Sequence, residues 1–180
     1  MKSNKDECER ILFLDIDGVL NTMEYSRSLI ASGKKDTDID GAIFDPRSIE
    51  WLGYIIDETH AKIVFSTSWR LDGSQYMKDL WMRRRLPGEI AGITPHIDRI
   101  YFYDIDNKIQ YTRHAFGIRG MEIYHWLRMN TNECLKPYTY AILDDENDFL
   151  LFQAGHVVLT NPNTGITKEV ADKIIQILRS

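Results

Sequence analysis

The chain has 180 residues, of which 43% are hydrophobic and 27% charged, and its formal net charge is −5. This length suits a single domain over residues 1–180 with a substantial core, and the acidic balance argues against non-specific nucleic-acid binding, which usually needs a basic face. No window approaches the roughly 20 apolar residues of a membrane span. The first ten residues are polar, unlike a signal peptide, and the two cysteines, Cys8 and Cys134, lie far apart. We therefore expect a cytoplasmic protein that has no disulfide framework and does not contact a membrane.

The most informative segment is an apolar strand that runs directly into two aspartates. Residues 11–14 are all apolar, and Asp15, Asp17 and Gly18 follow. On a strand, residues at i and i+2 point to the same side, so both carboxylates should lie at the strand's carboxyl end. Open α/β sheets bind their ligands at that end. Two like charges so close need compensation, and a hard divalent cation with oxygen ligands is the natural candidate.

The rest of the chain alternates between helix-like and strand-like patterns. Residues 21–45 are polar and poorly periodic, which predicts a flap with a short helix around residues 23–31. A second insertion, over residues 99–113, alternates like a β-hairpin. Further helices are expected to start at Asp45-Pro46, to span residues 74–85 and 119–129, and to follow Thr167; further core strands are expected at residues 62–65, 138–143 and 156–159. Such alternation predicts an α/β fold, a three-layer Rossmann-like parallel sheet with minimal cap insertions.

Reactive side chains stand where the predicted strands end, and a basic residue stands at the start of a predicted helix. In chain order these residues are Asp15 and Asp17, Ser66, Arg119, and Asp144 with Asp148. The ordered set resembles the haloacid dehalogenase (HAD) superfamily of phosphohydrolases, over nearly the whole chain from Ile11 to Leu178. Residues 13–21, 66–70, 119–127, 142–146 and 160–167 resemble more closely the small HAD domains of Swiss Army Knife RNA repair proteins.

The resemblance implies a role for each reactive side chain. Asp15 would be the nucleophile that forms an aspartyl-phosphate intermediate. Asp17 would protonate the leaving oxygen and then deprotonate the attacking water. Ser66 would donate a hydrogen bond to a phosphoryl oxygen, and Arg119 would neutralise charge on the transferring group. Arg113 competes with Arg119 for this role; we favour Arg119 because it stands one turn before the apolar Ile123, at the helix entrance.

The resemblance also implies a Mg²⁺ cofactor. The ion would bridge Asp15, the backbone carbonyl of Asp17, and Asp144. Asp148 would be a second ligand or an outer-shell acid, and Asp145 would replace Asp144 if the register slips by one residue. Each of these positions supplies the oxygen ligands that a hard cation prefers.

Two residues after Ser66 are candidates for substrate binding. Arg70 could reach a substrate phosphate, Ser68 could assist Ser66 or cap the following turn, and Trp69 between them is expected in the core. The predicted activity is Mg²⁺-dependent phosphomonoester hydrolysis. The expected substrate is phosphorylated, either a nucleic-acid end or a nucleotide, and no obligate protein partner is indicated. The alternatives are a phosphotransferase of the same fold and a non-catalytic phosphate-binding module.

Overall fold

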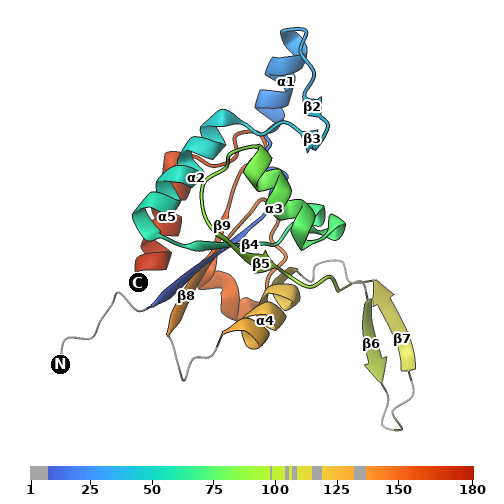
Figure 1. The fold of residues 1–180 in the computed structure, drawn as a ribbon. Coiled ribbons are helices and arrows are strands. Elements are labelled where there is room, and N and C mark those ends of the chain that lie inside the picture. The colour runs from blue at the N-terminus through green and yellow to red at the C-terminus, as the bar shows by residue number, and fades with distance from the viewer. Residues whose placement is uncertain (1–7, 98, 104–105, 107–108, 115–118, 132–136) are drawn as a thin grey trace, which may run out of the picture.

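A parallel five-stranded sheet forms the centre of the molecule, in the order β5-β4-β1-β8-β9 (Figure 1). The computed structural model describes residues 8–97, 99–103, 106, 109–114, 119–131 and 137–180. The strands are β1 (Glu9–Leu14), β4 (Lys62–Phe65), β5 (Ile90–Ile93), β8 (Tyr138–Asp144) and β9 (Val157–Leu159). The chain runs outward from β1 to the β5 edge and then returns to the other side of β1. Sheets with this reversal bind ligands at the carboxyl ends of the strands beside the reversal point.

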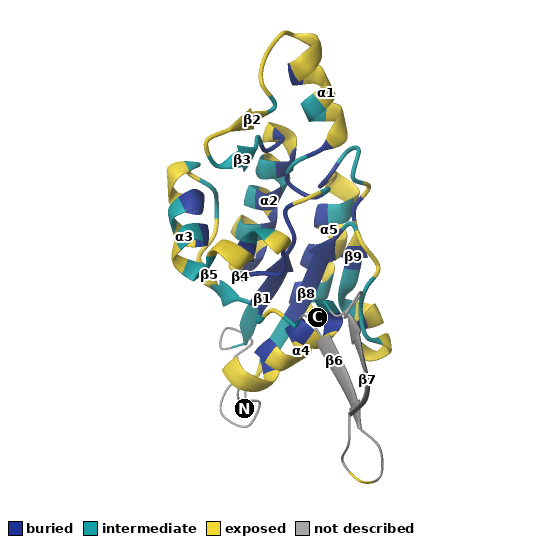
Figure 2. Cartoon of the chain, turned by 90° about the vertical axis from the view of Figure 1, so that its right-hand side faces the viewer, coloured by how far each residue is buried: buried dark blue, intermediate teal, exposed yellow. Residues whose placement is uncertain are grey.

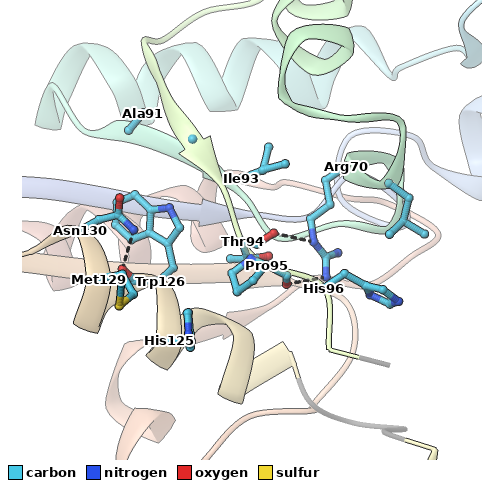
Figure 3. Close-up of a pocket in the computed structure, with 12 residues that line it drawn as sticks. Arg70, Ala91, Ile93, Thr94, Pro95, His96, His125, Trp126, Met129 and Asn130 are labelled. Atoms are coloured by element: carbon cyan, nitrogen blue, oxygen red, sulfur yellow. Dashed lines mark hydrogen bonds between the residues drawn. The ribbon is translucent and has the colours of Figure 1, made fainter. Parts of the chain in front are cut away.

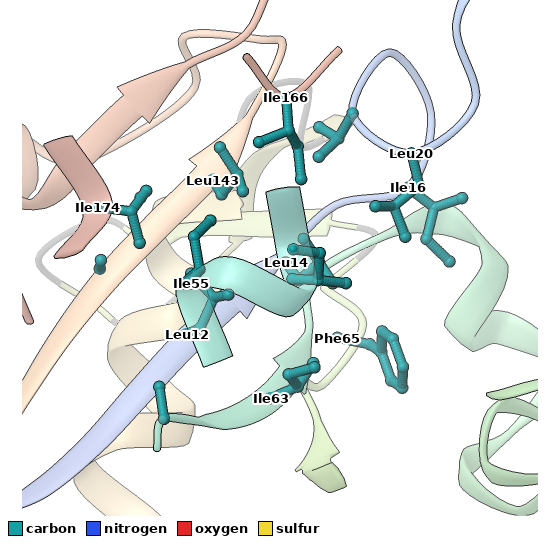
Figure 4. Close-up of a cluster of buried hydrophobic side chains, with 14 of the residues drawn as sticks. Leu12, Leu14, Ile16, Leu20, Ile55, Ile63, Phe65, Leu143, Ile166 and Ile174 are labelled. Carbon is teal, nitrogen blue, oxygen red and sulfur yellow. The ribbon is translucent and has the colours of Figure 1, made fainter. Parts of the chain in front are cut away.

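Helices cover both faces of this sheet. They are α2 (Pro46–Thr59), α3 (Ser74–Arg83), α4 (Arg119–Asn130) and α5 (Lys168–Arg179). On one face, Leu14 belongs to the same buried cluster as Ile55 of α2 and Ile174 of α5 (Figure 4). On the other face, Phe13 packs edge-to-face against Trp126 of α4, with ring centroids 5.5 Å apart. Strands β1 and β8 are buried between these layers (Figure 2), and the three-layer Rossmann-like fold class predicted from the sequence is confirmed.

Local signals in the sequence explain where the helices begin and end. Asp45 caps α2 by accepting a 2.9 Å hydrogen bond from the backbone N–H of Arg47, and Pro46 is the first helical residue. Thr167 caps α5 in the same way. Helix α3 ends at Arg83, two residues earlier than predicted, because Arg85 adopts a left-handed conformation with φ of 52°.

The predicted flap contains a helix and two very short strands. These elements are α1 (Met23–Ala31), β2 (Thr37–Asp38) and β3 (Gly41–Ala42). Two arginines of the α3 end hold the flap: Arg84 lies 2.8 Å from the carboxylate of Asp38, and Arg83 pairs with Asp40. Helix α1 projects from the carboxyl side of the sheet, at the top of Figure 1.

The second insertion is the expected antiparallel hairpin, β6 (Arg99–Tyr103) with β7 (Ile109–His114). Most of its predicted turn lies outside the described residues. The hairpin projects away from the sheet at the lower right of Figure 1. Among the helices of the described ranges, none has the length and apolar character needed to cross a membrane.

The edge strand β5 was not predicted from the sequence. It has only four residues, and Gly92 interrupts its apolar pattern. It pairs in parallel with β4, so its carboxyl end joins the same edge of the sheet as the other strand ends.

Candidate active site

Three predicted site residues meet at the carboxyl ends of three adjacent strands. Asp15 follows β1, Ser66 follows β4, and Asp144 ends β8. The backbone hydrogen bonds between the parallel strands continue to this edge of the sheet. The N–H of Asp15 donates to the carbonyl of Leu143 at 3.0 Å, and the N–H of Ser66 donates to the carbonyl of Leu14 at 2.9 Å. The three residues expose 3%, 1% and 0% of their surface. The parallel register therefore brings three polar groups into one buried site.

Arg119, the first residue of α4, joins the two buried carboxylates. Its Nη1 lies 3.0 Å from Oδ1 of Asp15 and 3.0 Å from Oδ2 of Asp144, and it also donates to the carbonyl of Ser66. Burial lowers the pKa of Arg119, but the charges of Asp15 and Asp144 outweigh it, and the net pKa is raised. Arg119 therefore lies at the site, and the side chain of the competing residue, Arg113, lies outside the described part of the chain.

The negative charges of Asp15 and Asp144 are only partly stabilised by the groups around them. Burial raises the pKa of Asp15 in spite of the nearby Arg119. Burial, together with the charge of Asp15, raises the pKa of Asp144 to about 8. Without a cation, the pair therefore tends to hold a proton near neutral pH.

A third carboxylate completes a group that fits a divalent cation. Asp15, Asp144 and Asp145 each offer an oxygen, and these oxygens lie within 4.8 Å of one another. The approach of Asp145 depends on Gly18, which has φ of +67°; a Cβ there would lie 2.3 Å from Oδ2 of Asp145. Mg²⁺ prefers oxygen ligands such as these three carboxylates, two of which are buried and repel each other. The sequence placed Asp145 only as a substitute for Asp144, whereas the structure brings both into the group.

Asp148, which was predicted to be a second metal ligand or an outer-shell acid, lies outside the group formed by Asp15, Asp144 and Asp145. Its carboxylate accepts a hydrogen bond from the backbone N–H of Arg119, and its carbonyl accepts one from Gly120 at 3.1 Å. Asp148 thus caps the start of α4, where the amide groups lack partners within the helix. It helps to place Arg119 and does not belong to the carboxylate group.

Asp17 lies outside the group, on the exposed side of the turn. Its carboxylate accepts hydrogen bonds from Nδ2 of Asn21 at 2.6 Å and from Nε1 of Trp69 at 3.1 Å, and Oγ of Ser68 lies 3.5 Å away. Any part of Asp17 in metal binding would thus fall to its backbone carbonyl. Sequence reasoning assigned Trp69 to the core alone; its ring does pack there, against Phe44, but its N–H faces Asp17.

Two hydroxyl groups follow β4, and they differ in their partners. The Thr67 hydroxyl accepts a hydrogen bond from the backbone N–H of Trp69 at 3.4 Å, and the Thr67 side chain lowers the pKa of Asp15, an effect that the sequence did not suggest. The Ser66 hydroxyl is buried and has no hydrogen-bond partner among the described residues. Buried polar atoms are rarely left without a partner, so this hydroxyl is available to a bound ligand.

Arg70, which was predicted to be able to reach a substrate phosphate, is bound by other groups of the protein in this structure. Its side chain is buried and donates to the carbonyls of Thr67, Thr94 and Pro95, and it forms an ion pair with Glu122. Figure 3 shows the guanidinium directed at Thr94 and Pro95, beside a pocket of about 540 Å³ between β5 and α4. Arg70 therefore fixes the short 3₁₀ helix η2 (Ser68–Asp72) that carries Ser68 and Trp69.

Comparison with known proteins gives one match. Residues 11–171 match the family model described as the HAD domain in Swiss Army Knife RNA repair proteins. No curated protein and no solved structure matches the chain. The match includes every residue of the candidate site, from Asp15 to Asp148.

Proposed function

Because the chain belongs to the family of HAD domains found in Swiss Army Knife RNA repair proteins, we propose that it is a Mg²⁺-dependent phosphomonoesterase acting through Asp15. The observation that carries this proposal is the position of Arg119, whose Nη1 lies 3.0 Å from Oδ1 of Asp15. The buried carboxylate of Asp15 is suited to attack a phosphoryl group. The Arg119 guanidinium and the unpartnered Ser66 hydroxyl are suited to stabilise that group.

The reaction would proceed in two balanced steps. First, a carboxylate oxygen of Asp15 attacks phosphorus while the bond to the ester oxygen breaks, and that oxygen takes a proton from Asp17. Then water attacks the same phosphorus, gives a proton to Asp17, and releases the Asp15 carboxylate. The products are an alcohol and inorganic phosphate, and both aspartates return to their initial states.

The surrounding residues stabilise the charge that this transfer develops. The guanidinium of Arg119 faces the nucleophile, and the Ser66 hydroxyl would donate to a phosphoryl oxygen. Asp15, Asp144 and Asp145, with the carbonyl of Asp17, would hold Mg²⁺. When bound, the ion supplies positive charge that lowers the repulsion between the anionic phosphate and the aspartates.

The proposed substrate is a phosphorylated nucleic-acid end or a nucleotide, in line with the family in which these domains occur. The two insertions support this choice because both are small: the flap carries one nine-residue helix and two short strands, and the hairpin has two strands. A small lid leaves room for the end of a polymer.

The first experiment measures phosphate release from para-nitrophenyl phosphate, with Mg²⁺ or with EDTA. We expect Mg²⁺-dependent release by the wild type and none by Asp15→Asn. Asp172→Asn, which removes an exposed carboxylate of α5 that pairs with Lys168, is the matched control and should behave as wild type. Oligonucleotides with 3′- or 5′-phosphates would then be compared with nucleotides. The absence of Mg²⁺-dependent release from every one of these substrates would contradict the proposed activity.

A further inference from the structure

The indole of Trp69 makes a two-way contact with the exposed Asp17. Its Nε1 lies 3.1 Å from Oδ1 and 3.1 Å from Oδ2 of that carboxylate. We infer that Trp69 is a positioning residue, which holds Asp17 in the orientation needed for proton transfer to a strongly basic leaving group. This inference rests on the proposed phosphatase activity and gives a function to a residue to which the resemblance assigned no role in the reaction.

Several contacts fix the position of Trp69. The backbone N–H of Trp69 donates to the hydroxyl of Thr67, and the centroid of the indole ring lies 5.7 Å from that of the Phe44 ring. The flap closes over the ring at Gly41, where a Cβ would lie 3.0 Å from Cη2 of Trp69. Arg84, which is ion-paired to the flap, stands over Phe44 and 5.9 Å from the Trp69 ring. The exposed carboxylate of Asp17 therefore faces a donor whose position is fixed by its own packing.

The two oxygens of Asp17 are not equivalent. Oδ1 accepts a second, 2.6 Å hydrogen bond from Nδ2 of Asn21. Oδ2 has only the Ser68 hydroxyl in addition to the indole, at 3.5 Å, the outer limit of a hydrogen bond. Oδ2 therefore has the free lone-pair direction, and we assign the transferred proton to this oxygen.

The role predicts a dependence on the leaving group. Protonation of the ester oxygen matters most when the departing alkoxide or phenoxide is a strong base, and little when it is a stable anion such as para-nitrophenolate. Trp69 should therefore be most important for esters of ordinary alcohols, the chemistry of a phosphate on a sugar hydroxyl.

The test compares two substrates of similar shape, phenyl phosphate and para-nitrophenyl phosphate, in the presence of Mg²⁺. Trp69→Phe keeps an aromatic ring and removes the N–H donor. We expect kcat/KM on phenyl phosphate to fall about 10- to 100-fold, as for other misplaced catalytic groups. On para-nitrophenyl phosphate kcat/KM should fall less than about threefold, because kcat/KM reports the steps up to departure of the leaving group and not the later attack of water, which is common to both substrates. Equal losses on both substrates would overturn the inference.

Trp81→Phe is the matched control. The Nε1 of Trp81 donates to the carbonyl of Pro87 at 2.9 Å, within the core and outside the site. The Trp81→Phe substitution removes a similar indole hydrogen bond and should change the rates on phenyl phosphate and para-nitrophenyl phosphate by the same factor. If Trp81→Phe also lowered the rate on phenyl phosphate more than the rate on para-nitrophenyl phosphate, the selectivity would reflect a loss of protein stability. That result would overturn the role of Trp69.

A spectroscopic measurement tests the contact without relying on activity. The chain has four tryptophans, so four indole ¹H–¹⁵N signals are expected, and Trp69→Phe identifies that of Trp69. Asp17→Ala should move this signal and leave that of Trp81 in place. If the Trp69 signal does not move, the inference fails even where the phosphatase activity is confirmed. If the signal moves but the wild type hydrolyses neither substrate nor phosphorylated oligonucleotides, the proposed function fails while the contact stands.

Discussion

Arg70 and Glu122 form a buried ion pair that ties η2 to α4, with 6% and 7% of their side chains exposed. The second carboxylate oxygen of Glu122 accepts a 2.8 Å hydrogen bond from the backbone N–H of Ile97. Glu122 thus connects the Trp69-bearing segment, the residues after β5, and the helix that begins with Arg119. The pair therefore helps to hold η2 and the start of α4 in their relative positions.

Removing one partner of this pair should destabilise the protein strongly. Glu122→Gln or Arg70→Met would leave the other group buried without its counter-charge, a change that typically costs about 3–5 kcal/mol. Urea unfolding measures the loss. The double variant Arg70→Met with Glu122→Leu should lose less than the two single losses combined, because no unpaired charge remains. Single variants within about 0.5 kcal/mol of wild type would contradict this role, since only surface substitutions are usually so mild.

Arg119 should be needed for catalysis, with its geometry mattering as well as its charge. Arg119→Ala should lower kcat by about 10²–10³-fold, the usual effect of losing one group that stabilises the transition state. Arg119→Lys should retain part of the activity, because lysine keeps the charge but carries it on a more flexible side chain that does not hold an N–H group at the position of Nη1. Arg128→Ala, on the exposed last turn of the same helix, is the control. Equal kcat for Arg119→Ala and Arg128→Ala would exclude Arg119 from the reaction.

The metal-free protein should lose stability as the pH rises from about 4 to about 8. The pKa of Asp144 is raised from 3.8 to about 8 by burial and by the charge of Asp15. In this range the folded state binds more protons than the unfolded state, so the free energy of unfolding falls with increasing pH. Urea unfolding in EDTA at several pH values should show this slope, and Asp144→Asn should reduce it.

Mg²⁺ should reverse the fall in the free energy of unfolding with increasing pH, because it binds the deprotonated carboxylates and is held more tightly as they lose their protons. An identical slope for wild type and Asp144→Asn, or an equal Mg²⁺ effect at pH 5 and pH 8, would contradict this assignment.

Gly18→Ala should weaken Mg²⁺ binding. The new Cβ would lie 2.3 Å from Oδ2 of Asp145 and would also disfavour the left-handed backbone at this position. The displaced carboxylate should cost about 10-fold or more in Mg²⁺ affinity, measured as a smaller Mg²⁺-induced rise in Tm. Gly155→Ala, where an added Cβ meets nothing within 4 Å, is the matched control. Equal affinities in the two variants would rule out the proposed place of Asp145.

The parts that were predictable from sequence are those with local signals. The apolar runs before Asp15, Ser66 and Asp144 determine three adjacent parallel strands, and parallel register alone brings their ends together. Strand β5 lacked such a signal because it is short and contains Gly92.

The side-chain partners at the site depend on three-dimensional packing. Spacing alone could not tell that Asp148 turns toward the α4 amides while Asp145 turns toward Gly18. Likewise, spacing alone could not tell that Arg70 is buried against Glu122, which lies 52 residues further along the chain.

The most direct test of the central proposal is chemical identification of the phosphorylated residue. The Asp17→Asn variant, which should accumulate the intermediate because it cannot deprotonate water, is mixed with Mg²⁺ and para-nitrophenyl phosphate and then quenched with acid. Borohydride reduces an aspartyl phosphate to homoserine, and peptide mass spectrometry locates the change. Homoserine at position 15, absent when Asp15→Asn is added to the same variant, is the predicted result. Homoserine at another aspartate, or phosphate release by the wild type with no modified residue in any quenched sample, would contradict Asp15 as the nucleophile.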